Sequence, residues 1–224
     1  MLTIASAVDA GCRTAALASA TPTAFIVAGD ASARAVLQGA IEAAGWRAGI
    51  VASAQAFLAC PRARVPSCLI IDIGTRDPGA LDVQRRVAAE RPETPIVFTG
   101  CADVRLAVQA MKAGAMECLG APWSQEALLD AIEYAFERSR QVLERQARLT
   151  LLHESYRSLT AREREVMVLV VSGLLNKQVG GELGISEITV KAHRGQVMRK
   201  MGAESLPALV HMVADLGLHM TANG

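Results

Sequence analysis

The chain has 224 residues, a net charge of +1 and 51% hydrophobic residues against 20% charged ones, a composition that excludes a disordered protein. Single domains usually have roughly 100–200 residues, so the length fits one large domain or two ordinary ones. The longest uncharged stretch, 16 residues from Thr14 to Gly29, is shorter than the ~20 apolar residues of a membrane span. No basic segment of a secretory signal precedes it. We therefore expect a cytoplasmic protein without a membrane partner.

The first 136 residues predict a tail and an α/β domain. Residues 1–22 are rich in Ala, Ser and Thr without sustained periodicity, and we expect a flexible tail there, with a short helix as the alternative. From residue 23 onward, short aliphatic runs alternate with segments of helical pattern, as in proteins with buried parallel strands. The predicted strands are 25–27, 49–51, 68–71, 96–98 and 116–119, and the predicted helices are about 31–44, 53–59, 80–90, 103–113 and from 124 onward. This alternation predicts a five-stranded, doubly wound parallel sheet over residues 23–136, with ligand sites at the carboxyl ends of its strands.

A long helix is predicted to follow this domain. No Gly or Pro occurs from Trp123 to Ser172, so the last helix of the sheet domain is expected to continue through a helical linker over residues 137–158. Apolar residues recur along it at spacings of three, four or seven. This stripe either forms a dimer seam with a second copy or packs on the chain's own domains, and the pattern favours neither alternative. Its members are Leu128, Ile132, Ala135, Val142, Leu149, Leu152, Tyr156 and Leu159.

The last segment, residues 159–224, is predicted to be a small domain of four helices. Thr160 and Glu163 have the spacing of a capping box at the start of the first helix, and Gly173 is placed where that helix should end. A short helix, a tight turn, a longer helix and a fourth helix follow, at about 177–183, 183–186, 187–201 and 205–217. Two helices joined by such a turn, here about residues 175–194, form a helix-turn-helix.

The second helix of this motif has an apolar and a basic face. Its apolar residues share one side at helical spacing, whereas Lys191 and Arg194 lie on another side, and Arg199 and Lys200 extend the basic character toward its end. A helix that buries one face and presents Lys and Arg on the other can enter the major groove of DNA. Because residues 159–224 hold seven basic and six acidic residues, the arrangement of the charges and not their sum predicts this function.

Three motifs in this segment occur in one order: Leu-Thr-x-Arg-Glu-x-Glu-Val from Leu159, Gly-x-x-Asn-Lys from Gly173, and Leu-Gly-Ile-Ser-x-x-Thr-Val-Lys-x-His-Arg from Leu183. Over residues 159–217 the chain resembles the LuxR-type DNA-binding domain of FixJ/NarL-type response regulators. The resemblance implies that the helix over 187–201 reads double-stranded DNA. It places three residues at base edges, namely Lys191, Ala192 and Gly195, and four nearer phosphates, namely Lys177, Thr189, His193 and Arg194. With only a methyl group at Ala192 and no side chain at Gly195, we expect readout through few base contacts and through DNA shape.

One pair of positions departs from this family. The family usually has Ile-Ala where this chain has Val179 and Gly180, and Gly181 follows. Two glycines inside a short helix cost about 1 kcal/mol each against Ala, so we expect this helix to be loosely held.

Residues 111–115 read Met-Lys-Ala-Gly-Ala, and together with the five-strand order they resemble the receiver domain of the same regulators over about residues 24–136. The resemblance implies that an aspartate takes a phosphoryl group from a histidine kinase, with a divalent metal ion and cationic groups around the phosphoryl oxygens. Asp72, at the end of the third apolar run, matches the phosphoacceptor. Thr99, at the end of the fourth, matches the switch hydroxyl that follows the phosphoryl group.

Four positions of the receiver resemblance lack the family's functional residue: Ala28, Gly29, Cys118 and Ala121. The first two align with the acidic pair that holds Mg²⁺, the third with the aromatic switch residue, and the last with a lysine that contacts the phosphoryl group. Asp30, one residue past the acidic pair, reaches a metal ion only if the backbone shifts, and Lys112 belongs to the fourth helix rather than to the site. Removing one preorganised charged group from an active site typically costs ~10²–10³ in rate, so we expect no Mg²⁺ binding, no other cofactor and no ordinary phosphorylation.

The five cysteines, at positions 12, 60, 68, 101 and 118, have neither zinc-ligand spacing nor a C-x-x-C motif. We expect these cysteines to be small buried hydrophobic residues of a protein in a reducing compartment. Cys101 and Cys118 should both lie near Asp72, where a redox switch is the alternative to inert burial. No neighbouring Lys or His indicates a lowered thiol pKa, which favours inert burial.

The sequence therefore predicts a DNA-binding transcriptional regulator, acting as a homodimer, with an atypical receiver and no enzymatic activity of its own. Two alternatives stay open. One is a conventional two-component output that a histidine kinase phosphorylates at Asp72. The other is an interaction protein that sequesters a regulator or a kinase, which the two glycines at 180 and 181 favour.

Overall fold

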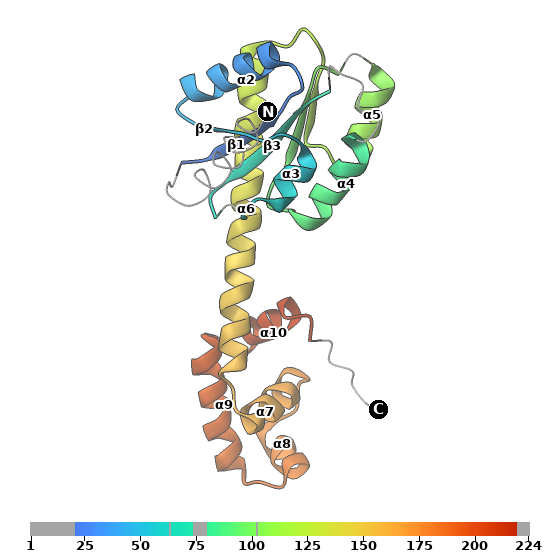
Figure 1. The fold of residues 1–224 in the computed structure, drawn as a ribbon. Helices are drawn as coiled ribbons and strands as arrows, with labels where there is room; N and C mark the ends of the chain where they lie inside the picture. The colour runs from blue at the N-terminus through green and yellow to red at the C-terminus, as the bar shows by residue number, and fades with distance from the viewer. Residues whose placement is uncertain (1–20, 63, 74–79, 102, 219–224) are drawn as a thin grey trace. The chain divides into compact units, whose positions relative to one another are not determined.

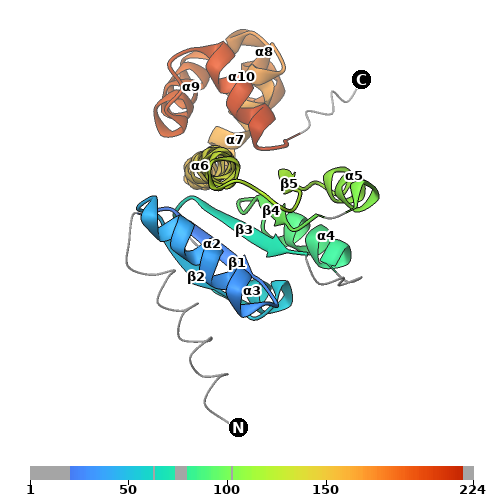
Figure 2. The same ribbon diagram turned by 90° about the horizontal axis from the view of Figure 1, so that it is seen from above.

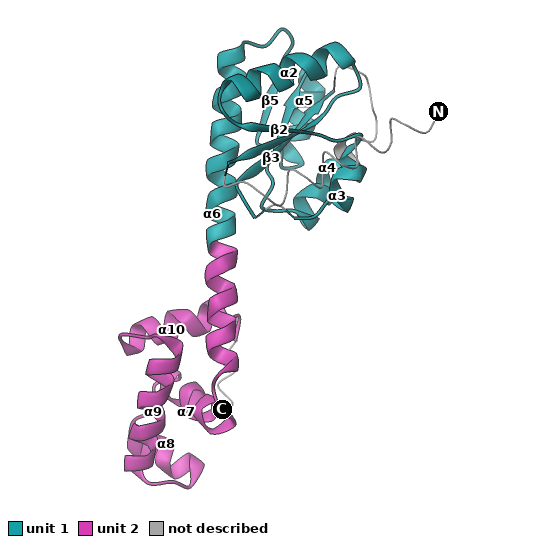
Figure 3. Ribbon diagram, turned by 60° about the vertical axis from the view of Figure 1, so that its left-hand side comes forward, with its two compact units in different colours: residues 1–144 teal, residues 145–224 magenta. Residues whose placement is uncertain are grey.

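The computed structural model describes residues 21–62, 64–73, 80–101 and 103–218, so nearly all of the predicted N-terminal tail lies outside the described residues. The chain divides into two compact units, residues 1–144 and 145–224 (Figure 3). The division falls inside α6 (Gln125–Arg157), which is one helix of 33 residues. Within the described ranges, no helix is both long enough and apolar enough to cross a membrane.

A five-stranded parallel sheet forms the centre of unit 1 (Figure 1), and the order of its strands is β2-β1-β3-β4-β5. This confirms the predicted fold class. The strand that differs most from its predicted range is β2, which begins at Arg47 rather than at residue 49. It lies at an edge of the sheet and has one neighbour, so its apolar pattern is weaker than that of a central strand. The strands are β1 (Thr23–Val27), β2 (Arg47–Ile50), β3 (Ser67–Asp72), β4 (Ile96–Thr99) and β5 (Glu117–Leu119).

Helices cover both faces of the sheet because successive residues of each strand point to opposite faces. Phe25 of β1 belongs to the core under one set of helices, and its neighbour Ile26 belongs to the core under the other set. The turned view in Figure 2 shows β3, β4 and β5 between α6 and the pair of α4 and α5. One face carries α2 (Ala31–Ala43) and the first part of α6, and the other carries α3 (Ala54–Ala59), α4 (Ala80–Glu90) and α5 (Val104–Lys112).

Four helices and the end of α6 form unit 2. The predicted capping box is confirmed: the Thr160 hydroxyl accepts from the Glu163 backbone N–H, and the Glu163 carboxylate accepts from the Thr160 N–H. Gly173, just past the first helix, has a φ of 95°, which L side chains rarely adopt. Met167 and Leu209 are among the buried residues of the main core. The helices are α7 (Ala161–Val171), α8 (Asn176–Leu183), α9 (Glu187–Met201) and α10 (Leu206–Asp215).

The apolar stripe of α6 is largely used inside the two units. Ile132 is buried against the sheet of unit 1, and Leu152 is buried in the core of unit 2. Between them, Val142 and Leu149 are half-buried. The alternative in which the stripe packs on the chain's own domains therefore holds for both ends of the helix.

Candidate nucleic-acid interface and receiver site

Helix α9 presents one side to unit 2 and leaves the opposite side open. Ser186 caps its start by accepting from the Thr189 N–H, and Gly202, with a φ of 68°, ends it. Three apolar residues face the core of the unit, namely Val190, Val197 and Met201. The three residues expected at base edges, Lys191, Ala192 and Gly195, are all exposed.

A close backbone approach holds α8 against the turn that leads into α9. Gly180 is buried, and a Cβ built on it would lie 2.8 Å from the carbonyl oxygen of Ile185. The Ile185 N–H in turn donates to the Gly180 carbonyl over 3.0 Å. The expectation that both glycines loosen α8 is therefore wrong for Gly180, because the absence of a side chain permits this approach. For Gly181, which has open space where its Cβ would be, the expectation stays a prediction.

The basic side chains of this region differ in what holds them. The ammonium of Lys191 lies 2.9 Å from the Glu187 carboxylate on the same exposed face. The Arg194 guanidinium, half-buried, donates to Asn176 Oδ1 over 3.2 Å, which fixes it beside the first turn of α8. Lys177 is exposed, and Thr189 and His193 are half-buried.

Lys200 does not extend the basic face of α9 as expected. Its ammonium lies 2.7 Å from the buried Glu163 carboxylate and also donates to the Ser158 carbonyl. The hydrogen bond from Lys200 and that from the Thr160 N–H hold the pKa of Glu163 below its usual range. Lys200 thus joins α9 to the start of α7 and is occupied inside unit 2.

Ile188 is a residue of the open face that the sequence analysis missed. Its side chain is 79% exposed, and it precedes Lys191, Ala192 and Gly195 by three, four and seven residues. At helical spacing these four residues share one side. The helical spacing of Ile188 from Lys191, Ala192 and Gly195 could have identified it in the sequence, because a large aliphatic side chain is uncommon on an exposed, otherwise polar face of a helix.

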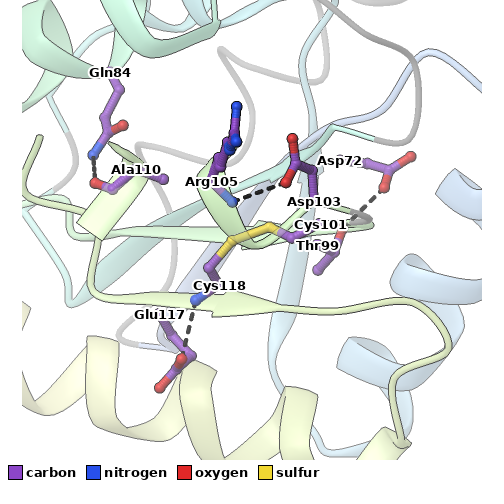
Figure 4. Close-up of a disulfide and its surroundings, with 9 residues drawn as sticks. All are labelled: Asp72, Gln84, Thr99, Cys101, Asp103, Arg105, Ala110, Glu117 and Cys118. Atoms are coloured by element: carbon purple, nitrogen blue, oxygen red, sulfur yellow. Dashed lines mark hydrogen bonds between the residues drawn. A yellow bond between two sulfur atoms is a disulfide. The ribbon is translucent and has the colours of Figure 1, made fainter. Parts of the chain in front are cut away.

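The receiver site lies at the carboxyl ends of β3 and β4. Asp72 and Thr99 are register partners at the ends of these adjacent strands. The Thr99 hydroxyl, which is fully buried, donates to Asp72 Oδ1 over 3.2 Å (Figure 4). The structure therefore brings together the two residues that the resemblance assigns to phosphoryl transfer.

The end of β1 does not present the pair of carboxylates that the family has there. Asp30 caps α2 by accepting from the Ala33 N–H over 2.7 Å, and the Arg34 guanidinium donates to the Ala28 carbonyl over 2.8 Å. Ala28 is buried, and Gly29 and Ala121 are exposed. In the part of the chain that the structure describes, no group of three His, Cys, Asp or Glu side chains could hold a metal ion.

The cysteines beside this site are bonded to each other, which corrects the expectation of inert free thiols. Cys101, in the loop after β4, and Cys118, in β5, form a disulfide with a Cα–Cα distance of 6.4 Å (Figure 4). The two residues are 17 apart in the sequence, and the parallel pairing of β4 with β5 brings them together. Cys68, in contrast, is a free and fully buried cysteine whose thiol pKa is raised by burial.

Two family models match the chain, one in each unit. Residues 24–133 match the response regulator receiver domain, and residues 157–213 match the bacterial regulatory proteins of the luxR family. Nodulation protein W from Bradyrhizobium diazoefficiens is 40% identical over 195 residues, which cover 87% of this chain and 86% of that protein. The chain belongs to the LuxR-type response regulators.

Other relatives also match most of this chain. Response regulator protein TmoT from Ectopseudomonas mendocina is 38% identical over 86% of this chain and 88% of that protein. The transcriptional regulatory protein FixJ of Bradyrhizobium diazoefficiens is 32% identical over 87% of this chain and 95% of that protein. The solved structure of the response regulator StyR matches with a TM-score of 0.73 and 37% identity, covering 87% of this chain and 98% of that one. This LuxR-type response regulator is a DNA-binding regulator of transcription, as its two domains and its relatives establish together.

Proposed function

We propose that this response regulator acts as a cytoplasmic homodimer that binds double-stranded DNA through α9, and that Mg²⁺-dependent phosphorylation of its receiver is not its input. The observation that carries the second part is the contact between Arg34 and the Ala28 carbonyl. A fixed cation there lies at the strand end where the family resemblance expects acidic metal ligands.

The available donors do not fit Mg²⁺. This ion requires nearly octahedral coordination by oxygen atoms, usually including one or two carboxylates. Asp30 is engaged as a helix cap, the Ala28 carbonyl already accepts from a guanidinium, and Gly29 has no side chain. Ala121 supplies no cation to a phosphoryl group. These features support a receiver that keeps its fold without its usual chemistry.

For DNA binding, the open side of α9 supplies the base contacts, from Lys191, Ala192 and Gly195, with Ile188 available for the methyl group of thymine. The phosphate contacts come from side chains at the two ends of the motif: Lys177, Thr189, His193 and Arg194. Because Asn176 fixes the guanidinium of Arg194, this contact costs little side-chain entropy on binding.

Tryptophan fluorescence tests whether the receiver binds a metal and a phosphoryl group. Trp123 follows Pro122 and lies close to the receiver site in the sequence, and Trp46 packs edge-on against Phe136 with ring centroids 5.3 Å apart, so it serves as an internal reference. We expect no saturable change in fluorescence when Mg²⁺ is titrated with or without beryllofluoride. Saturable quenching that Asp72→Asn abolishes would contradict the proposal and restore an ordinary two-component scheme.

A conventional regulator phosphorylated at Asp72 is the second candidate, because the hydrogen bond between Thr99 and Asp72 is retained. The two candidates differ in the effect of Asp72→Glu, which imitates a phosphorylated aspartate. We expect the DNA affinity of this variant to equal that of the wild type, measured by fluorescence anisotropy with a labelled duplex. A clear rise in affinity would favour the second candidate.

A further inference from the structure

The Cys101–Cys118 disulfide encloses helix α5 in a covalent ring. Cys101 precedes α5 and Cys118 follows it in β5, so the segment between the two sulfur atoms contains the whole of Val104–Lys112. Cys118 also occupies the position where the family resemblance places an aromatic switch residue. Figure 4 shows the bond beside Thr99, the other switch position. A covalent bond therefore takes the place of the side chain that would otherwise respond to a phosphoryl group.

Noncovalent packing holds α5 only weakly. Ala110 is the fully buried residue of the helix, and Leu106 and Ala107 pack in part against the core. Most of its large apolar side chains point away from the sheet and are exposed: Val104 by 78%, Val108 by 46% and Met111 by 45%. The bond between Cys101 and Cys118 therefore adds a covalent constraint beside a helix that buries few side chains.

The contact between α4 and α5 is incomplete. Gln84 of α4 is fully buried, and its amide nitrogen donates to the Ala110 carbonyl over 2.9 Å (Figure 4). Its amide oxygen has no hydrogen-bond partner among the described groups. An unpaired buried oxygen costs free energy, which a displacement of α5 that admits water would relieve.

The disulfide is accessible to a small reagent. Cys101 and Cys118 both line an open groove of about 470 Å³ between α5 and β5, and Cys118 is half-buried rather than buried. Cys68 lies in the core with no exposed surface. A small thiol can therefore approach the bond from the groove, whereas no such route leads to Cys68.

We propose that the Cys101–Cys118 disulfide is a reversible redox site, opened by low-molecular-weight thiols, and that its opening releases α5 and changes DNA binding. The regulatory part of this inference rests on the proposed function. DNA-binding regulators work in compartments that are kept reducing, and a disulfide that forms there is usually transient or redox-sensing rather than structural.

The reaction is thiol–disulfide exchange. A thiolate attacks the Cys118 sulfur, the bond between the two cysteines breaks, and Cys101 leaves as a thiolate that takes up a proton. A second thiolate attacks the reagent sulfur of the resulting mixed disulfide, and Cys118 leaves and is protonated. In total, two reagent thiols are oxidised to one disulfide, and the protein disulfide is reduced to two thiols.

Alkylation and hydrogen exchange test the redox site in the full chain. The oxidised protein is equilibrated in glutathione buffers of increasing reduced fraction, labelled with iodoacetamide and mapped by mass spectrometry. We expect Cys101 and Cys118 to become labelled together while Cys68 stays unlabelled. In the same samples, the amides of residues 104–112 should exchange faster after reduction, and those of β1 and β3 should not change.

The double variant Cys101→Ser, Cys118→Ser is the matched control, because it removes the bond at almost constant volume. We expect its α5 amides to exchange at the rate of the reduced wild type in every buffer. Two results would overturn the proposal: a bond that excess dithiothreitol leaves closed in the folded protein, or equal α5 exchange in the oxidised and reduced wild type.

DNA affinity separates this inference from the proposed function. We expect the oxidised and reduced proteins to differ in Kd for a duplex by about fivefold or more, and Asp72→Asn to show the same difference. Equal Kd values in the two states would overturn the regulatory part of the inference. If neither state binds DNA, the proposed function fails, while labelling and α5 exchange still decide whether the bond is a redox site.

Discussion

Gly180 and Gly181 are adjacent, yet they have different physical roles. Gly180 lies against the backbone of the turn, where a Cβ would meet the Ile185 carbonyl at 2.8 Å. Gly181 is exposed, and its missing side chain only adds conformational freedom to the unfolded chain. In the sequence, the two glycines look like a single weakness of the helix. In the structure, close packing requires Gly180, and only Gly181 is expected to weaken the helix.

Substitution by alanine should therefore have opposite effects at these two positions. Gly181→Ala should raise the free energy of unfolding by about 0.5–1 kcal/mol, through helix propensity and reduced chain entropy. Gly180→Ala should lower it by about 1–3 kcal/mol, because backbone must move to admit the methyl group. Urea unfolding followed by circular dichroism measures both, and each variant is the control for the other. Equal effects at the two positions would contradict the close approach at Gly180.

Lys177, which we place near the phosphates, is the residue whose charge should be visible in the salt dependence of DNA binding. Because this side chain is proposed to contact one phosphate, Lys177→Ala should weaken binding and reduce the slope of log K against log salt by about 0.9. Lys112→Ala is a matched control, because this lysine lies in the receiver unit, outside the proposed DNA-binding surface. An unchanged slope in Lys177→Ala would contradict the phosphate contact proposed for this side chain.

At the scale of elements, one buried carboxylate connects the start of α7 to the end of α9. Glu163 completes the capping box of α7 and also binds the Lys200 ammonium at 2.7 Å. The open face of α9 depends on how this helix is held at its other side. The pair therefore helps to position α9 within unit 2.

This pair should make the stability of unit 2 sensitive to acid. Lys200 and the Thr160 N–H lower the pKa of Glu163 in the folded state. A group with a lowered pKa contributes its full stabilisation above its unfolded value, about 4.3 for Glu, and loses it as the pH falls through the folded value. The thermal midpoint of the wild type should therefore fall below about pH 4.3 more steeply than that of Glu163→Gln. Glu204→Gln, at an exposed position, should keep the steep wild-type profile in the same circular dichroism measurement.

At the scale of the whole molecule, the chain consists of two units that each have their own hydrophobic cores. The receiver site and the disulfide belong to the first unit, and the proposed DNA-binding surface belongs to the second. If the regulator is a dimer, its two α9 helices can meet two half-sites separated by about one turn of DNA, or about 34 Å.

A dimer on two half-sites predicts a strict dependence on their spacing. For a palindromic site selected from random DNA, inserting about half a helical turn between the half-sites should lower the affinity by about 100-fold, since the second half-site is lost. Inserting a full helical turn should restore part of the lost affinity. Equal affinities for the three spacings, measured by gel shift, would indicate binding by a monomer.

Local patterns were sufficient for most of the fold. The apolar runs gave five strands, because a buried parallel strand needs a continuous aliphatic segment whatever its neighbours are. The capping box at Thr160 and the turn at Gly184 could be read directly, since each depends on residues within one helical turn. The strand pattern placed Asp72 and Thr99 at the carboxyl ends of parallel strands, where ligand sites are expected, whereas their hydrogen bond is a result of the tertiary structure.

The residues whose roles differed from the prediction all contact other segments of the chain, which only folding brings close to them. Lys200 reaches back 37 residues to Glu163, and Cys118 bonds to Cys101, 17 residues earlier in the chain. The sequence by itself determined the fold class and the helix-turn-helix, because these depend on residue type and spacing along the chain. Only the tertiary structure decided that Cys101 pairs with Cys118 and that Gly180 is required, because both depend on the distance between backbone segments, which packing sets.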